Sequence, residues 1–261
     1  MVAATFRMPR TVAAETLDAL APDDPRAMRS RRDLRRVHRV MRTRSTLLLA
    51  LRGMTALHHK PEPLRVLELG AGDGSLMLGV ARALAPEWPT VALTLLDAKQ
   101  LMHSDTVKGY AALGWTAVAQ VGDVFDWVAG DTDGMRLGQP APRWNLILCN
   151  LFLHHFEGAQ LAQLLGAIAS QSDLFFACEP RREWLALAGS HLIGVIGANA
   201  VTREDAVLSV HAGFRSKELS ACWPGSPTAW QVEEYPAGLF SHCFRAERVQ
   251  ADEGPVHANR V

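Results

Sequence analysis

The stretch "VLELGAGDGS", residues 66–75, decides the fold of this chain. An apolar run over residues 64–69 predicts a buried strand, and three glycines follow at alternate positions, Gly70, Gly72 and Gly74. Glycine adopts positive φ without strain and lets a ligand approach the backbone closely. A glycine turn between a strand and a helix is typical of the ligand-binding crevice of open α/β sheets.

Apolar runs alternate with helical patterns from this point on. The expected strands are 64–69, 91–97, 115–121, 144–150 and 172–178, followed by a hairpin pair at 229–235 and 240–248. This alternation predicts an α/β fold, a Rossmann-like seven-stranded sheet that is mostly parallel, with its last strand antiparallel and helices on both faces. Helices are expected at 75–85 and 158–170 and two or three more within 183–222, while 131–143 has the composition of a loop.

Residues 1–60 are expected to form a separate helical region, followed by the sheet domain at 61–250 and a disordered tail at 251–261. In one helix of this region, Leu34, Val37, Met41 and Leu48 share a face, and Arg32, Arg35, Arg36 and Arg39 lie opposite. Such a helix packs on the core with a solvated basic face, or touches an anionic membrane surface weakly. No aromatic residues alternate with the arginines, so RNA binding is disfavoured.

The composition is that of an ordinary globular protein. Of 261 residues, 48% are hydrophobic and 21% charged, and the formal net charge is zero, which gives no overall attraction to nucleic acid. Four scattered cysteines without a CxxC pair are expected to be free thiols, and no metal site is signalled. Without a secretory pattern or an apolar run of about 18 residues, a cytoplasmic location is expected.

The glycine spacing separates two classes of ligand. A dinucleotide site would need its third glycine at position 75, which is Ser75. The sequence instead reads Glu68, then G-x-G-x-G, which resembles motif I of the class I S-adenosylmethionine (SAM)-dependent methyltransferases. The resemblance implies SAM as the cofactor, held by the turn residues Glu68, Gly70, Ala71, Gly72 and Gly74.

Two acidic residues at expected strand ends extend the resemblance. A carboxylate at Asp97 can accept hydrogen bonds from both ribose hydroxyls, unless it is only a cap or loop residue. In the family, the residue at Asp123 contacts the adenine amino group and its neighbour Val124 packs on the ring; a helix cap is the alternative. Ala98 and Gly122 complete the cofactor residues expected at this edge.

The stretch "WNLILCNLFLHHFE", residues 144–157, resembles the fourth-strand motif of small-molecule methyltransferases. Asn150 and Leu151 would lie beside the methionyl end of SAM. His154 is expected to act as a base or to orient the acceptor, and otherwise to pack or cap the next helix. His155 is assigned to the substrate side, with a structural role as the alternative. Asn150 is not followed by a proline pair, which argues against methylation of nucleobase amino groups.

Later residues would bind the acceptor. Glu179 and Arg181 would orient a polar group or form a surface ion pair. Leu192, Ile193, Val195 and Ile196 would form an apolar wall or pack on the sheet. From about residue 29 to 248 the chain looks like a bacterial group related to quinone-biosynthesis methyltransferases, which implies a phenol, quinol-like or polyketide acceptor, with O-methylation favoured over C-methylation.

Two other functions remain open at this level. The first is an NAD(P)-dependent oxidoreductase, which Ser75 and the lack of a YxxxK pair disfavour. The second is a SAM-binding protein without catalytic activity.

Overall fold

The structure is a computed structural model that describes residues 8–54, 57, 63–130 and 143–249. Almost all of the expected loop at 131–143 and the whole expected tail at 251–261 lie outside the described residues.

Seven strands form one sheet in the order β3-β2-β1-β4-β5-β7-β6. Their bounds are β1 (Leu64–Leu69), β2 (Val91–Asp97), β3 (Thr116–Val121), β4 (Trp144–Asn150), β5 (Ser172–Pro180), β6 (Trp230–Ala237) and β7 (Ser241–Arg248). Strands β1 to β5 pair in parallel, and β7 is antiparallel to both neighbours. A connection of only three residues joins β6 to β7, which forces them to be antiparallel. The predicted sheet is confirmed.

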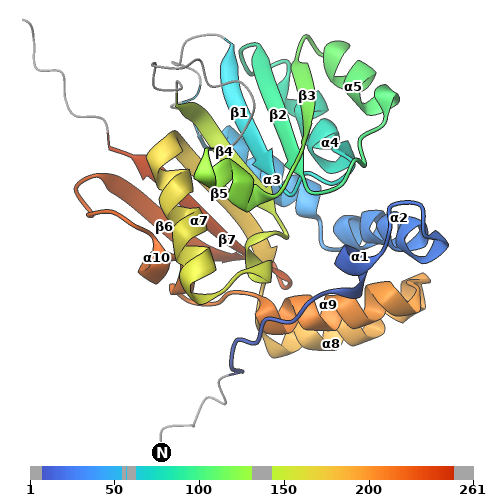
Figure 1. Cartoon of the computed structure of the whole chain (residues 1–261). Coiled ribbons are helices and arrows are strands. Elements are labelled where there is room, and N and C mark those ends of the chain that lie inside the picture. Colours follow the sequence, from blue (N-terminus) through green and yellow to red (C-terminus); the bar gives the residue numbers. More distant parts are fainter. Residues whose placement is uncertain (1–7, 55–56, 58–62, 131–142, 250–261) are drawn as a thin grey trace, which may run out of the picture.

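Helices cover both faces of the sheet (Figure 1). One face carries α3 (Thr43–Arg52), α4 (Ser75–Leu84) and α5 (Ser104–Ala111), and the other carries α6 (Val124–Ala129), α7 (Gly158–Gln171) and α10 (Glu218–Cys222). Successive β1 residues enter the two cores in turn, because side chains alternate across a strand: Val66 faces α4 and Leu67 faces α7. Glu68 therefore points to the α4 side.

The N-terminal region contains three helices, α1 (Thr16–Ala19), α2 (Pro25–Val40) and α3. Arg42 adopts the left-handed conformation, with φ 57°, and separates α2 from α3. The single helix expected to carry both Leu34 and Leu48 is therefore wrong. Leu47 of α3 is fully buried in the same core as β1 and α4, so this region shares the core of the sheet domain.

The four arginines of the expected basic face, Arg32, Arg35, Arg36 and Arg39, are exposed on α2. The buried side of α2 is largely polar: Ser30 donates a hydrogen bond to Asn199, and Asp33 accepts one from the Asn199 backbone. Asn199 caps the N-terminus of α9 (Ala200–Ala212). Polar contacts thus dock α2 on α9.

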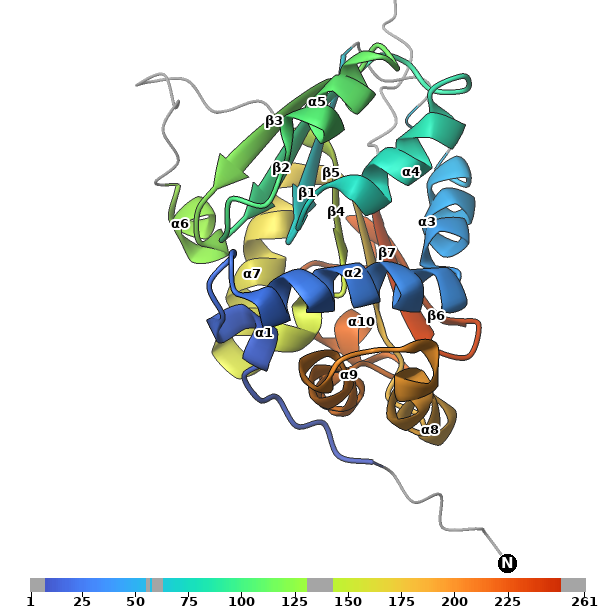
Figure 2. The same ribbon diagram turned by 90° about the vertical axis from the view of Figure 1, so that its right-hand side faces the viewer.

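A group of helices lies beyond the carboxyl ends of the parallel strands (Figure 2). It consists of α1, α2, α8 (Trp184–Leu192), the 3₁₀ helix η3 (Ile193–Ile196) and α9; we call this group the cap. Ligands of open α/β sheets bind at that end of the strands. The cap therefore faces the edge where the glycine turn lies. Among the described residues, no helix is long and apolar enough to cross a membrane.

Candidate active site

The glycine turn follows β1 directly. Its three glycines all have positive φ, and each lies in a different environment. A side chain at Gly70 (φ 67°) would place its Cβ 2.4 Å from the ring of Phe152, so packing alone demands glycine there. At Gly72 (φ 59°) an added Cβ would meet nothing within 4 Å, so this part of the turn faces open space. Gly74 (φ 68°) precedes α4 and accepts a hydrogen bond from Tyr110.

Two acceptor atoms beside this turn are buried and have no hydrogen-bond partner among the residues that the structure describes. They are Oε2 of Glu68, at the end of β1, and Oδ1 of Asn150, at the end of the neighbouring β4. Buried polar atoms in native proteins are nearly always paired, so two orphans at one edge point to a missing donor. Nε2 of His38, on α2, is also buried and has no hydrogen-bond partner within the described part of the chain. Burial lowers the pKa of His38 to about 4, although the charge of Asp73 opposes the shift.

Glu68 is a carboxyl in unfavourable surroundings. Only 3% of its surface is exposed. Burial raises the pKa of Glu68 to about 8, and the negative charges of Asp97 and Asp73 add to the shift. The group is therefore neutral near pH 7, and a cation placed against it would favour the charged carboxylate.

Asp97 ties the glycine turn to β2. Its carboxylate accepts hydrogen bonds from the backbone N–H of Gly72 (2.8 Å) and of Lys99 (2.9 Å). The N–H of Gly122 reaches the Asp97 carbonyl at 3.0 Å, and Ala98 beside it is exposed. The structure therefore brings these three predicted cofactor residues to the glycine turn, and their contacts with a ligand stay a prediction.

Asp123 caps α6, as the alternative interpretation held. Its carboxylate accepts a hydrogen bond from the Phe125 N–H at 2.7 Å, and its side chain is exposed. Val124 is 93% buried in the core on the α7 side of the sheet. The adenine contact of these two residues stays a prediction.

Backbone strain lies at the end of β4. Leu151 has φ 52°, a conformation that costs a residue with a side chain about 1–2 kcal/mol. Its N–H bonds the carbonyl of Cys178 at 2.9 Å. The turn brings Phe152 against Gly70 and starts the 3₁₀ helix η2 (Leu153–His155). Strained conformations persist where the surroundings enforce them, and they concentrate at functional sites.

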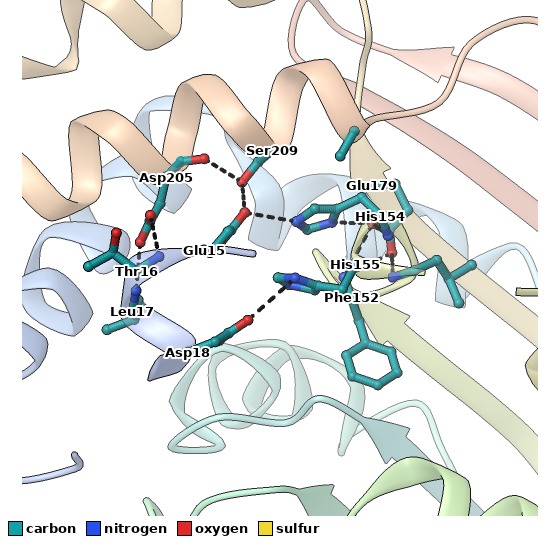
Figure 3. A network of polar contacts seen from close by, with 12 residues as sticks. Glu15, Thr16, Leu17, Asp18, Phe152, His154, His155, Glu179, Asp205 and Ser209 are labelled. Atoms are coloured by element: carbon teal, nitrogen blue, oxygen red, sulfur yellow. Dashed lines mark hydrogen bonds and ion pairs between the residues drawn. The ribbon is translucent and has the colours of Figure 1, made fainter. Parts of the chain in front are cut away.

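His154 lies between two carboxylates (Figure 3). Nδ1 is 2.8 Å from Glu179 and Nε2 is 3.3 Å from Glu15. Burial opposes a charge on this ring, yet the hydrogen bonds to Glu15 and Glu179 outweigh it and raise the pKa of His154 to about 9. The predicted role as general base does not fit this arrangement, because a base needs an unprotonated nitrogen that faces the acceptor.

Glu179 is fully buried and is a positioning residue. Its oxygens accept hydrogen bonds from the N–H groups of Phe152, Leu153 and His154, at 2.9–3.3 Å. Both predicted roles, substrate contact and surface ion pair, are therefore wrong for Glu179. Arg181 donates to the carbonyl of Gly238 and so is tied to the connection between β6 and β7.

The N-terminal segment, residues 15–18, supplies site residues that the sequence did not indicate (Figure 3). Glu15 accepts a hydrogen bond from Ser209 of α9, and Asp205 of α9 accepts the N–H groups of Thr16 (2.8 Å) and Leu17 (2.9 Å). Asp18 lies 3.4 Å from Nδ1 of the half-buried His155. Since 139 residues separate Glu15 from His154, no local pattern could have paired them.

The expected apolar wall lies on an open surface. Leu192 is 64% exposed, Val195 85% and Ile196 37%. These side chains are exposed and do not pack on the sheet, so that alternative is wrong for them, and their contact with an acceptor stays a prediction. They could contact an acceptor only as part of an exposed apolar surface of the cap.

The strand order, the glycine turn after β1 and the single antiparallel strand are those of the class I SAM-dependent methyltransferase fold. The chain resembles a plantazolicin methyltransferase, BpumL, solved with a triazolic desmethylPZN analog and S-adenosylhomocysteine (SAH); the TM-score is 0.58 at 13% identity, over 87% of this chain and 92% of that one. A magnesium protoporphyrin IX methyltransferase from Synechocystis PCC 6803 with bound SAH gives a TM-score of 0.46 at 16% identity, over 84% and 86%. No family model and no curated protein matches the sequence.

Proposed function

We propose that this protein is a SAM-dependent methyltransferase that acts on a small molecule. The observation that carries the proposal is the pair of unpartnered acceptors, Glu68 Oε2 and Asn150 Oδ1, beside the open backbone at Gly72. The ammonium group of SAM or SAH would donate hydrogen bonds to these two atoms. Its positive charge would also stabilise the ionised form of Glu68. The plantazolicin methyltransferase structure that resembles this fold also contains SAH.

The residues at this edge fit the other parts of the cofactor. Asp97 keeps lone pairs beyond its two backbone hydrogen bonds, and these can accept ribose hydroxyls. Bound SAM would supply a methyl group on a positively charged sulfur. The protein would mainly hold the acceptor in line with that group, since positioning alone supplies several kcal/mol of the rate enhancement. A general base is not part of this proposal.

For the acceptor we propose a hydrophobic phenol, quinol-like compound or polyketide, with O-methylation favoured and C-methylation possible. This rests on the sequence resemblance over residues 29–248 and on the exposed apolar residues of the cap. His155 and Arg181 stay as predicted substrate residues.

Charge disfavours the oxidoreductase alternative. Asp73 lies within the turn, Asp97 accepts a hydrogen bond from its Gly72 N–H, and Glu68 is buried near both charges. The carboxylates of Asp73 and Asp97 would repel a pyrophosphate, whereas they attract a ligand with an ammonium and a sulfonium. Glu68 is neutral near pH 7, and only a cation beside it favours its charged form. A non-catalytic SAM-binding protein stays open until turnover is measured.

We propose a cytoplasmic enzyme without nucleic-acid partners. The weak contact with a membrane surface stays a prediction for α2. Arg35 pairs with Asp73 (3.1 Å) and Arg36 with Asp33 (2.8 Å), which reduces the free charge on that face.

Two measurements test the function. Isothermal calorimetry should show one SAH site per chain and no binding of NAD⁺ or NADPH; the reverse result would overturn the proposal. Labelled SAM incubated with candidate phenols and quinols, followed by mass spectrometry, should show methylated product. SAH binding without any turnover across such a panel would favour the non-catalytic alternative.

A further inference from the structure

The N-terminal segment and η2 bring together three side chains that can coordinate a metal ion. The ligand atoms of Glu15, His154 and His155 all lie within 4.8 Å of one another. Asp18 lies at the exposed rim of this group, 3.4 Å from His155 Nδ1. Figure 3 shows the Glu15 side chain directed at His154 and the Asp18 side chain directed at His155.

The spacing is close to that of a real coordination sphere. Ligands bound 2.0–2.1 Å from a tetrahedral ion are about 3.4 Å apart. The separation between His154 Nε2 and Glu15 is 3.3 Å, and that between His155 Nδ1 and Asp18 is 3.4 Å. The other separations within the group are at most 4.8 Å, so a bound ion would draw the half-buried His155 ring closer.

The group also has the outer hydrogen bonds that metal sites require. A metal-binding histidine usually donates its other ring N–H to a carboxylate, which fixes the ring and the tautomer. Glu179, fully buried, accepts at Nδ1 of His154 and leaves Nε2 directed at Glu15. The hydroxyl of Ser209 donates a hydrogen bond to Glu15, and Asp205 accepts hydrogen bonds from the backbone of the segment.

We propose that Glu15, His154 and His155 bind a divalent transition-metal ion of the zinc class, with Asp18 as the fourth ligand. Two imidazoles with carboxylates favour zinc and its neighbours over magnesium or calcium, which prefer oxygen ligands. The ion would replace the proton on His154 Nε2, and that proton would leave to solvent. It would join residues 15–18 to η2, next to the turn that places Phe152 on Gly70.

The site is separate from the proposed cofactor site, since none of its ligands belongs to the glycine turn. The test therefore uses metal binding and not turnover. Tag-free full-length protein is stripped with a chelator and titrated with Co²⁺ by visible absorption and with Zn²⁺ by calorimetry. We expect one ion per chain, with the absorption bands of low-coordinate Co²⁺, and stronger hydrogen-exchange protection of residues 15–18 when the ion is bound.

Variants of the proposed ligand residues test whether the ion binds at this site or at other histidines of the chain. Glu15→Gln and His155→Gln should each weaken binding by at least about tenfold. The matched controls, Glu204→Gln on the exposed side of α9 and His103→Gln before α5, should bind as the wild type does. Since His155 is half-buried, its variant should fold even if Glu15→Gln does not. No uptake, or equal uptake by His155→Gln and the controls, would overturn the proposal, whereas loss of SAH binding alone would leave it unaffected.

Discussion

At the scale of the residue, Glu68 connects the fold to the proposed chemistry. A carboxyl group buried at a strand end is unfavourable unless it meets a donor or a cation. Here it meets the negative charges of Asp97 and Asp73. The unliganded protein therefore keeps Glu68 protonated near neutral pH. Binding of a cation at this edge should be coupled to loss of that proton.

This coupling predicts a pH dependence of SAH affinity. Below the raised pKa of Glu68, binding must release a proton, so the affinity should rise as pH increases from about 6 to about 7.5, by up to about tenfold per pH unit. Calorimetry in buffers of different ionisation enthalpy measures both the affinity and the released protons. Glu68→Gln should bind more weakly, and its affinity should vary less with pH. A wild-type profile without any slope would contradict this assignment.

A second prediction at this scale separates ligand contact from backbone strain. Gly72 and Gly114 both have positive φ and open space around the missing side chain, but Gly114 lies in the turn between α5 and β3. Alanine at either position should lower the free energy of unfolding by about 1–2 kcal/mol. Only Gly72→Ala should also weaken SAH binding, because a ligand there approaches the backbone. Equal SAH affinity in the two variants would show that Gly72 does not face the ligand.

At the scale of the element, the break between α2 and α3 is set by one residue. Arg42 has φ 57°, a left-handed conformation that costs free energy for arginine but not for glycine. The break turns the chain, so that α2 lies in the cap while Leu47 and Leu51 of α3 are buried in the core of the sheet domain. The periodicity of the sequence runs through this point without a glycine or proline, which is why a single helix was expected.

The break gives a prediction about stability. Arg42→Gly should raise the free energy of unfolding by about 0.5–1 kcal/mol, because relief of the left-handed strain exceeds the entropy cost of glycine. Arg39→Gly, in the last turn of α2, is the matched control and should lower it by about 1 kcal/mol. Urea unfolding followed by circular dichroism measures both. If Arg42→Gly destabilises the protein, the strain is not stored there.

At the scale of the whole molecule, the cap and the sheet hold the site between them. His38 comes from α2, Glu68 from β1 and Asn150 from β4, and each has a buried atom without a hydrogen-bond partner in the described ranges. A ligand that satisfies these atoms binds the folded protein only. Its binding must therefore stabilise the whole chain by mass action.

SAH at about one hundred times its dissociation constant should raise the free energy of unfolding by about 2.7 kcal/mol. NADH at the same concentration should not change it. The effect of SAH should fall in Glu68→Gln at that fixed concentration, because its affinity is lower. Thermal and chemical denaturation with each ligand measure the difference, and equal stabilisation by NADH would contradict the proposed ligand class.

The sequence by itself determined the strands, their mostly parallel direction and the residues of the glycine turn, whereas the order of the strands came from the structure. These follow from periodicity, turn composition and short-range spacing, all of which act within about 30 residues of chain. The tertiary structure alone decided the environment of each side chain. Glu15 reaches His154, and Phe152 reaches Gly70, only because the fold brings distant segments together. Because His154 is buried and hydrogen-bonded to Glu15 and Glu179, it is a protonated ring and not the expected base. No local pattern in the sequence carries that information.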